Sequence, residues 1–157
     1  GELAVMVFFY LTFIGGCSGS TAGGLKIFRV QVAYTMLRRQ LDRLVHPHAV
    51  FTERYNNREI GEDIIRSLIS FSFFFALTIG LLALSLSAVG LDFMTSMTGA
   101  ITAVCNVGPG LGQVIGPAGN FSTLPDAAKW LLSIGMLLGR LEIMTVLVVI
   151  TPGFWRG

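Results

Sequence analysis

Residues 93–110 read FMTSMTGAITAVCNVGPG, and this stretch decides how the chain is expected to fold. The segment 93–104 is apolar but far shorter than the roughly 20 residues that cross a bilayer as a helix. The segment 105–110 then brings two glycines and a proline. A short helix that enters the membrane and ends in a glycine-containing turn is typical of a pore loop, in which backbone carbonyls replace the water around a passing cation. We therefore predict a pore helix at 93–104 and a filter strand at 105–110.

Four backbone carbonyls of this strand are the candidate cation ligands. They belong to Cys105, Asn106, Val107 and Gly108. Gly108 is central to the prediction, because a filter strand often needs backbone angles that a residue with a Cβ disfavours. The C-terminal end of a preceding helix adds partial negative charge, which favours a cation there. The alternative interpretation is an ordinary Gly-Pro-Gly turn between two helices.

The composition is that of a membrane protein. Apolar residues make up 53% of the 157 residues and charged residues only 13%, against roughly 25% charged in soluble domains. Residues 67–91 form a run without charge that is long enough for a spanning helix. Most of the lysines and arginines lie between 26 and 66, so we expect that stretch to face the cytoplasm. Acidic residues interleave with them, which argues against a segment that binds nucleic acid.

The pattern of apolar segments predicts an all-α membrane protein. Segment 1–45 is interpreted as one helix broken by a glycine-rich intramembrane loop at 15–24, and 46–62 as a cytoplasmic connector. Residues 63–157 then form a helix–pore loop–helix repeat, with an outward helix at 63–88 before the pore helix and an inward helix at 126–152 after the filter. The chain begins inside an apolar run without an initiating Met, so we expect it to be a fragment whose upstream portion is missing.

The glycine-rich loop and one arginine form a second candidate site, a gate. The loop comprises Gly15, Gly16, Cys17, Ser18, Gly19, Ser20, Thr21, Ala22, Gly23 and Gly24. Irregular backbone at membrane depth survives only where protein or a water-filled cavity surrounds it. Arg140 lies near the middle of the inward helix, where a charge costs about 2.5–3.5 kcal/mol by insertion scales. Its predicted partners are carbonyl oxygens of the loop; a structural pair with a glutamate of another helix is the alternative.

Other chemistry is not predicted for this chain. Gly19 and Gly24 have the spacing of a phosphate-binding loop, but Leu25 stands where that motif needs its lysine. The sequence has no evident nucleophile–base or paired-carboxylate constellation, so we do not expect an enzyme. Cys17 and Cys105 give no disulfide framework and are expected to be free thiols.

Three motifs in order resemble a known family. They are GGCSGSTAGGLK at 15–26, NVGPGLG at 106–112 and MLLGRLE at 136–142, followed by TPGFW at 151–155. Together they resemble the C-terminal part of bacterial Trk-type potassium uptake proteins of the TrkH kind, within the Trk/Ktr/HKT superfamily. The resemblance covers nearly the whole chain.

The resemblance implies a fold of four linked helix–pore loop–helix repeats around one pore, similar to a potassium channel. This chain would hold the second helix of repeat three and all of repeat four. Gly108 would be the filter glycine, the 15–24 loop the gate below it, and Arg140 the basic residue that faces the loop. The implied partners are the other three repeats, membrane lipid, a second copy in a homodimer, and a cytoplasmic regulatory subunit with nucleotide-binding RCK domains.

The function expected from these observations is potassium uptake across the bacterial inner membrane through a gated, channel-like pore in a multi-pass protein. Potassium is the transported ion, and no other cofactor is expected. Two alternatives remain at this stage. One is an alternating-access cation symporter, because broken helices also build carrier sites. The other is a membrane scaffold that does not conduct.

Overall fold

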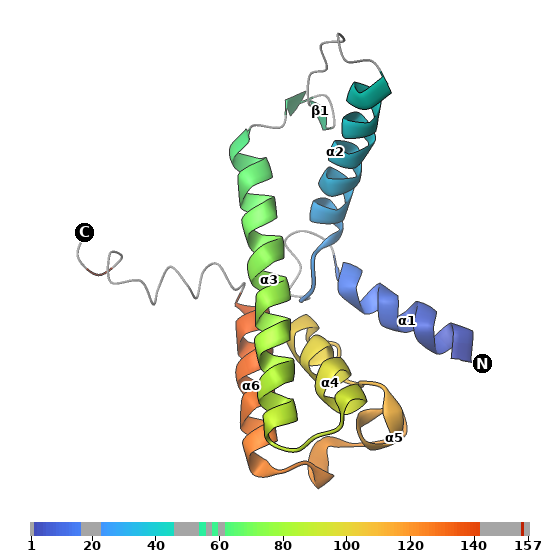
Figure 1. The fold of residues 1–157 in the computed structure, drawn as a ribbon, viewed down its shortest axis with the longest axis vertical. Helices are drawn as coiled ribbons and strands as arrows, with labels where there is room; N and C mark the ends of the chain where they lie inside the picture. The colour runs from blue at the N-terminus through green and yellow to red at the C-terminus, as the bar shows by residue number, and fades with distance from the viewer. Residues whose placement is uncertain are drawn as a thin grey trace.

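Three packed helices form the centre of the molecule (Figure 1). The structure, a computed structural model, describes residues 2–16, 23–45, 54–55, 58–59, 62–141 and 155. Its elements begin with α1 (Glu2–Ile14) and α2 (Ile27–Val45), followed by two-residue strands β1 (Arg54–Tyr55) and β2 (Arg58–Glu59). They continue with α3 (Glu62–Ala88), α4 (Phe93–Cys105), α5 (Gly112–Ile115), a 3-10 turn at Phe121–Thr123 and α6 (Asp126–Arg140). Helices α3, α4 and α6 pack against one another.

α3 is the helix that fits a membrane span. Its segment Ile65–Ala88 is 24 residues long with a mean hydropathy of 2.2, and it is the single helix among the described residues that meets the length and composition of a span. One stripe of α3 is buried against its neighbours, namely Phe71, Phe75, Ile79, Leu82 and Leu86. This spacing of three and four residues places all five on one helical face. The opposite face exposes large apolar side chains such as Phe73 and Leu84, as expected for a surface that meets lipid.

α4 is short, apolar and central. Ten of its 13 residues are buried, from Thr95 to Cys105. It begins at Asp92, whose carboxylate accepts a hydrogen bond from the Thr95 N–H at 3.1 Å and so satisfies one of the free N–H groups of the first turn. Hydrogen bonds from the side chain and backbone of Thr95 hold the pKa of Asp92 below its ordinary value. The helix is one residue longer than the predicted 93–104, since Cys105 completes its last turn.

α6 approaches α4 through small residues. Ala128, Leu132 and Gly135 are its buried positions, at a spacing of four and three residues. A Cβ added to Gly135 would lie 2.5 Å from a methyl carbon of Leu82 on α3. Small residues at such contacts allow the backbones of membrane helices to approach closely. α6 is described as far as Arg140, and the rest of the predicted helix 126–152 lies outside the described residues apart from Leu141.

The first predicted helix is broken, as the glycine-rich sequence indicates. α1 ends at Ile14 and α2 begins at Ile27. Two backbone hydrogen bonds join the two sides of this break. The Leu25 N–H donates to the Phe13 carbonyl at 3.0 Å, and the Ile27 N–H donates to the Gly16 carbonyl at 3.1 Å. We call residues 13–16 and 23–27 the neck. Residues 17–22 of the predicted loop lie outside the described residues.

Beyond the neck, α2 runs alongside the first half of α3 (Figure 1). The Arg29 guanidinium carbon lies 3.7 Å from the centre of the Phe71 ring, a cation–π contact between the two helices. The predicted connector 46–62 contains the antiparallel pair β1–β2, with Arg54 opposite Glu59 and Tyr55 opposite Arg58. Asn56 and Asn57, between the two strands, lie outside the described residues.

Candidate functional site: the filter strand and the neck

The strand after α4 turns sharply away from the helix. Asn106 adopts the left-handed conformation, with φ 55° and ψ 42°, and ends α4. Its N–H donates to the Ala103 carbonyl at 3.1 Å, and the Val107 N–H donates to the Thr102 carbonyl at 3.0 Å. These two bonds satisfy carbonyls that the helix end would otherwise leave without partners. We call residues 106–110 the filter strand, one residue shorter than the predicted 105–110 because Cys105 belongs to α4.

Gly108 occupies a backbone conformation that suits glycine. Its φ is 114°, in the region that residues with a Cβ rarely adopt. A Cβ built at Gly108 would meet no atom within 4 Å, so the requirement for glycine comes from the backbone angle and not from crowding. This is the feature that the sequence analysis expected at the position.

Buried threonine hydroxyls of α4 brace the strand. Thr102 is 1% exposed, and its hydroxyl donates to the Gly108 carbonyl at 3.0 Å. The hydroxyl of Thr98 accepts a hydrogen bond from the Leu111 N–H at 3.1 Å and donates to the Met94 carbonyl at 2.8 Å. The Asn106 side-chain amide adds a third tie, donating to the Met136 carbonyl of α6 at 3.0 Å. Side chains thus tie the strand to α4 at Gly108 and to α6 at Asn106, and tie Leu111, the residue after the strand, to α4.

The predicted ligand carbonyls have different surroundings. Among the described residues, no hydrogen bond is donated to the carbonyls of Cys105, Asn106 and Val107, whereas the Gly108 carbonyl accepts one from Thr102. Asn106 and Val107 are exposed in this structure, and Val107 retains 43% of its surface. A carbonyl without a hydrogen bond at an open surface is available to coordinate a cation.

The base of the strand and the neck are in contact. A Cβ added to Gly23 would lie 2.4 Å from the Cys105 carbonyl oxygen, so the neck backbone packs directly on the last turn of α4. On the other side of that turn, a Cβ on Gly139 of α6 would lie 1.9 Å from the Val104 carbonyl oxygen. Two consecutive carbonyls of α4 are therefore covered by two glycines from different segments.

Arg140 follows Gly139 directly and is the last residue of α6. Its position in sequence places it at the end of α6 that meets the C-terminal turn of α4. The predicted contact of Arg140 with the 15–24 loop involves residues 17–22, which lie outside the described residues. The role of Arg140 in gating therefore stays a prediction. The alternative, a pair with a glutamate of another helix, stays a prediction as well.

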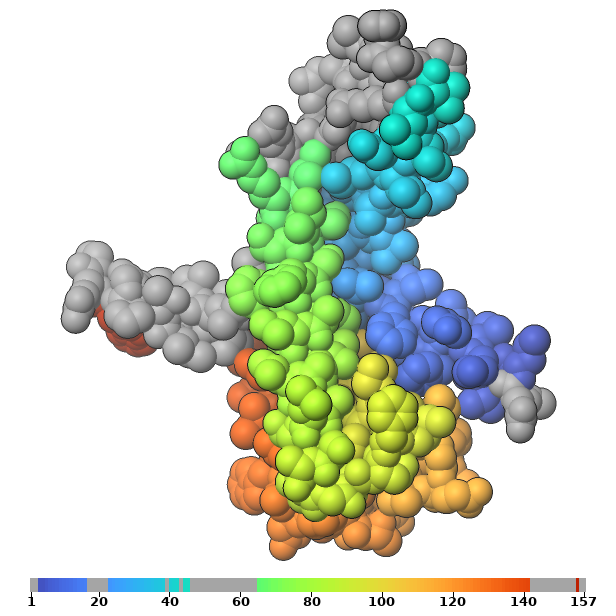
Figure 2. Space-filling model, in the orientation of Figure 1, coloured from blue at the N-terminus to red at the C-terminus, as the bar shows by residue number. Residues whose placement is uncertain are grey.

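A cavity of about 420 Å³ lies between α1 and the filter strand. Apolar side chains line it, with Phe8 and Phe9 on α1 and Val107, Pro109 and Leu111 on the other wall. The notch between α1 and the region around α5 is visible in Figure 2. The exposed side of the strand thus opens toward an apolar space.

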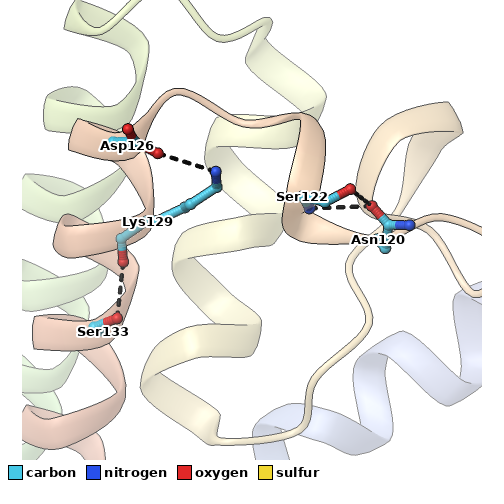
Figure 3. Close-up of polar contacts among 5 residues, drawn as sticks. All are labelled: Asn120, Ser122, Asp126, Lys129 and Ser133. Atoms are coloured by element: carbon cyan, nitrogen blue, oxygen red, sulfur yellow. Dashed lines mark hydrogen bonds and ion pairs between the residues drawn. The ribbon is translucent and has the colours of Figure 1, made fainter.

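The outer loop after the strand is held by local contacts (Figure 3). The Asn120 side chain accepts hydrogen bonds from the N–H of Ser122, at 3.0 Å, and from its hydroxyl. Lys129 and Asp126 form an exposed ion pair at 3.1 Å in the first turn of α6. These side-chain contacts join the four residues to one another and not to the filter strand, so this cluster is separate from the site.

The sequence predicted roles for Gly108 and the broken helix, but not for Thr98, Thr102 or Gly139. The signal for the two threonines was a pair of hydroxyl residues four positions apart, and therefore on one face, of a largely apolar helix. The Gly139 contact had no separate signal, because Gly139 was considered only as part of a motif around Arg140.

The fold defines an all-α membrane protein in which a short, buried apolar helix packs beside a helix long enough to span a bilayer. Residues 2–154 match the family model TrkH, described as "Cation transport protein". The chain belongs to this family of cation transport proteins. The predicted resemblance and the all-α membrane fold class are both confirmed.

Named relatives agree with the family model. The chain is 65% identical over 156 residues to the Trk system potassium uptake protein TrkI of Halomonas elongata, a match that covers 99% of this chain and 32% of the relative. It is 42% identical over 144 residues to the Trk system potassium uptake protein TrkH of Escherichia coli K12, a match that covers 92% of this chain and 29% of that relative. The crystal structure of the potassium transporter TrkH from Vibrio parahaemolyticus superimposes with a TM-score of 0.84 at 37% identity, covering 96% of this chain and 32% of that one. The chain therefore spans about a third of the length of these relatives.

Proposed function

We propose that this chain is part of a potassium uptake protein and that its filter strand supplies one wall of a cation filter. The observation that carries the proposal is the geometry at 106–108, which follows a short buried helix. Among the described residues, the Asn106 and Val107 carbonyls accept no hydrogen bond, the Gly108 carbonyl accepts one from Thr102, and Gly108 has a φ of 114°. The names of the relatives, which are potassium uptake proteins, support potassium as the ion.

A filter needs oxygen ligands from all sides, and this chain provides one strand. The exposed carbonyls and the apolar cavity beside them leave room for other segments of the full-length protein. We therefore place the remaining three pore-loop repeats around the strand, as the family resemblance implies. The same resemblance suggests a homodimer in the bacterial inner membrane, bound to a cytoplasmic regulatory subunit of the RCK type.

We further propose that the 15–24 segment is the gate. The neck rests on the Cys105 carbonyl, so the segment that leaves it is anchored directly at the base of the filter strand. A cation that passes Asn106 to Gly108 would next meet this segment. Arg140, one residue beyond the Gly139 contact, would hold the segment across the pore and repel cations while it is closed.

Uptake of rubidium, as a tracer for potassium, by cells that express the full-length protein tests the filter. Gly108→Ser should retain uptake but reduce its preference for potassium over sodium, because a side chain is strained at that φ and the neighbouring carbonyls must move. Unchanged selectivity in Gly108→Ser would reject the filter assignment.

The same assay with Arg140→Ala tests the gate. Faster uptake with unchanged selectivity is the expected result, and a rate equal to that of the wild type would reject the role of Arg140. Currents through single molecules in a planar bilayer distinguish a pore from an alternating-access carrier, which cannot produce them.

A further inference from the structure

Thr102 makes a contact that the other hydroxyls of these helices do not make. A serine or threonine hydroxyl inside a helix usually donates to the carbonyl four residues earlier. In this chain that pattern is followed by Thr35, Ser72, Thr78, Ser85, Thr98 and Ser133. The Thr102 hydroxyl instead donates forward to the Gly108 carbonyl, six residues later, at 3.0 Å.

The Gly108 carbonyl depends on this one bond. The peptide unit between Gly108 and Pro109 has no N–H, because proline lacks one, so the unit can be anchored only through its oxygen. No atom lies within 4 Å of a Cβ position at Gly108, so nothing packs against the backbone on that side. Among the described residues, the Thr102 hydroxyl is the one hydrogen-bond donor to this oxygen.

The bond leaves the carbonyl able to coordinate an ion. A carbonyl oxygen has two lone pairs, and a hydroxyl donor occupies one of them. The bond therefore fixes the direction of the other lone pair and reduces the negative field that the oxygen offers to a cation. Both the direction and the field strength of carbonyl ligands influence the choice between potassium and sodium.

We propose that Thr102 is a positioning residue that determines ion selectivity, by holding the Gly108 carbonyl at a fixed angle to the pore. This inference rests on the proposed function of the filter strand. Thr102 does not touch the ion itself; its burial, at 1% exposure, holds the hydroxyl beneath the strand and away from the pore.

Three variants of the full-length protein test the proposal. Thr102→Val keeps the shape of the side chain but removes the hydroxyl, whereas Thr102→Ser keeps the hydroxyl. Ser96→Ala is the matched control, because Ser96 is a 2% exposed hydroxyl of the same helix that contacts the Leu91 carbonyl at 3.3 Å and not the strand. The measurement is the ratio of potassium to sodium uptake, which does not depend on the amount of protein in the membrane.

Thr102→Val should lower this ratio about tenfold, as expected from the loss of one hydrogen bond. Thr102→Ser and Ser96→Ala should both keep the wild-type ratio. If Thr102→Val does not accumulate in the membrane, Thr102→Ala gives the same reading, since it also lacks the hydroxyl. A wild-type ratio in the variant without the hydroxyl would overturn the proposal, and so would an equal loss in Thr102→Ser.

The same experiment separates this proposal from the one on which it rests. If the wild-type protein takes up no potassium, or if Gly108→Ser leaves the ratio unchanged, the filter assignment itself fails. If Gly108→Ser lowers the ratio and Thr102→Val does not, the filter stands and only the role of Thr102 is rejected.

Discussion

The filter strand and the neck are two interruptions of helical structure that meet at Cys105, and they are held in different ways. The filter strand is held by side chains, through the hydroxyls of Thr98 and Thr102 and the amide of Asn106, in addition to backbone hydrogen bonds at its first residues. The neck is held by backbone hydrogen bonds and by the absence of side chains, since a Cβ on Gly15 or Gly23 would overlap backbone atoms.

This difference predicts how each region responds to substitution. A substitution can remove a polar group beside the strand without changing how tightly the residues pack. Such a substitution should change the orientation of the ligand carbonyls and leave the fold as it is. At Gly15 and Gly23 the neck packs backbone against backbone, so a carbon atom added at either glycine must displace backbone. Substitutions near the strand should therefore alter selectivity, and substitutions at the neck should alter stability and the rate of uptake.

The largest effect is expected at Gly139 of α6, which packs against the end of α4 where the filter strand and the neck meet. In Gly139→Ala the new Cβ would lie 1.9 Å from the Val104 carbonyl oxygen, so α6 must move away from α4. We expect a loss at or above the upper end of the roughly 1–3 kcal/mol typical of overpacking. Thermal unfolding of the purified full-length protein measures this. Gly80→Ala on α3 is the control, because its Cβ would meet nothing within 4 Å. Equal melting temperatures for the two variants would contradict the contact.

The next effect is expected at the neck itself. Gly23→Ala would place a Cβ 2.4 Å from the Cys105 carbonyl oxygen and push the neck away from α4. A cost of about 1–3 kcal/mol and a changed rate of rubidium uptake are expected, with little change in the potassium-to-sodium ratio. A normal rate of uptake with altered selectivity in Gly23→Ala would contradict the expectation that the neck affects stability and rate and not selectivity.

A smaller effect is expected from Thr98→Val, which removes the acceptor for the Leu111 N–H at the outer end of the strand. A buried N–H that loses its hydrogen-bond partner lowers the free energy of unfolding by about 1–3 kcal/mol. Because Leu111 is only partly buried, we expect a loss near the lower end of that range. Thr35→Val on α2 removes a hydroxyl from an exposed helix position and serves as the control. Thr98→Val should lower the ratio of potassium to sodium uptake. An equal decrease in Thr35→Val would show that the Thr98 hydrogen bond to Leu111 is not responsible.

Arg29→Met tests the attachment of α2 to α3 beyond the neck. It removes the charge over the Phe71 ring, an interaction of about 0.5–2 kcal/mol, while keeping a long apolar side chain. The melting temperature should fall slightly. Arg38→Met, at an exposed position of the same helix, should leave it unchanged. A decrease of the same size in both variants would mean that general charge, and not the ring contact, is responsible.

The smallest effect is expected at the outer end of α6, far from both regions. Asp126→Asn breaks the ion pair with Lys129, in which the Asp126 side chain is 91% exposed. Exposed pairs of this kind contribute little, so neither the melting temperature nor the uptake ratio should change measurably. A measurable shift in the uptake ratio would show that the outer loop influences the filter strand.

Sequence patterns could predict the elements of this fold but not their contacts. The charge-free run before Gly90 predicted α3, and the short apolar run after Asp92 predicted α4 to within one residue. These predictions work because the lengths of apolar segments reflect the thickness of the bilayer. The glycine-rich stretch correctly indicated where the first helix is interrupted, because glycine disfavours a helix whatever surrounds it.

The tertiary contacts of the same residues could not be predicted in this way. The sequence marks Thr102 as a polar residue in an apolar helix, but its partner six residues later depends on how sharply the chain turns at Asn106. Gly139 likewise carries no sign that it faces Val104, because that contact depends on the crossing of α4 and α6. Which carbonyls remain open to an ion was therefore visible only in three dimensions.

The contact of Gly23 with the Cys105 carbonyl has a thermodynamic consequence. The carbonyl that touches the neck is bonded directly to the residue that begins the filter strand, so the two regions share one rigid peptide. Linkage between two such sites is reciprocal. An ion whose binding displaces this peptide would change the equilibrium of the neck, and a movement of the neck would change the affinity for that ion by the same factor. If the neck anchors a gate, as proposed above, permeant ions of different size would open it to different extents without a separate sensor.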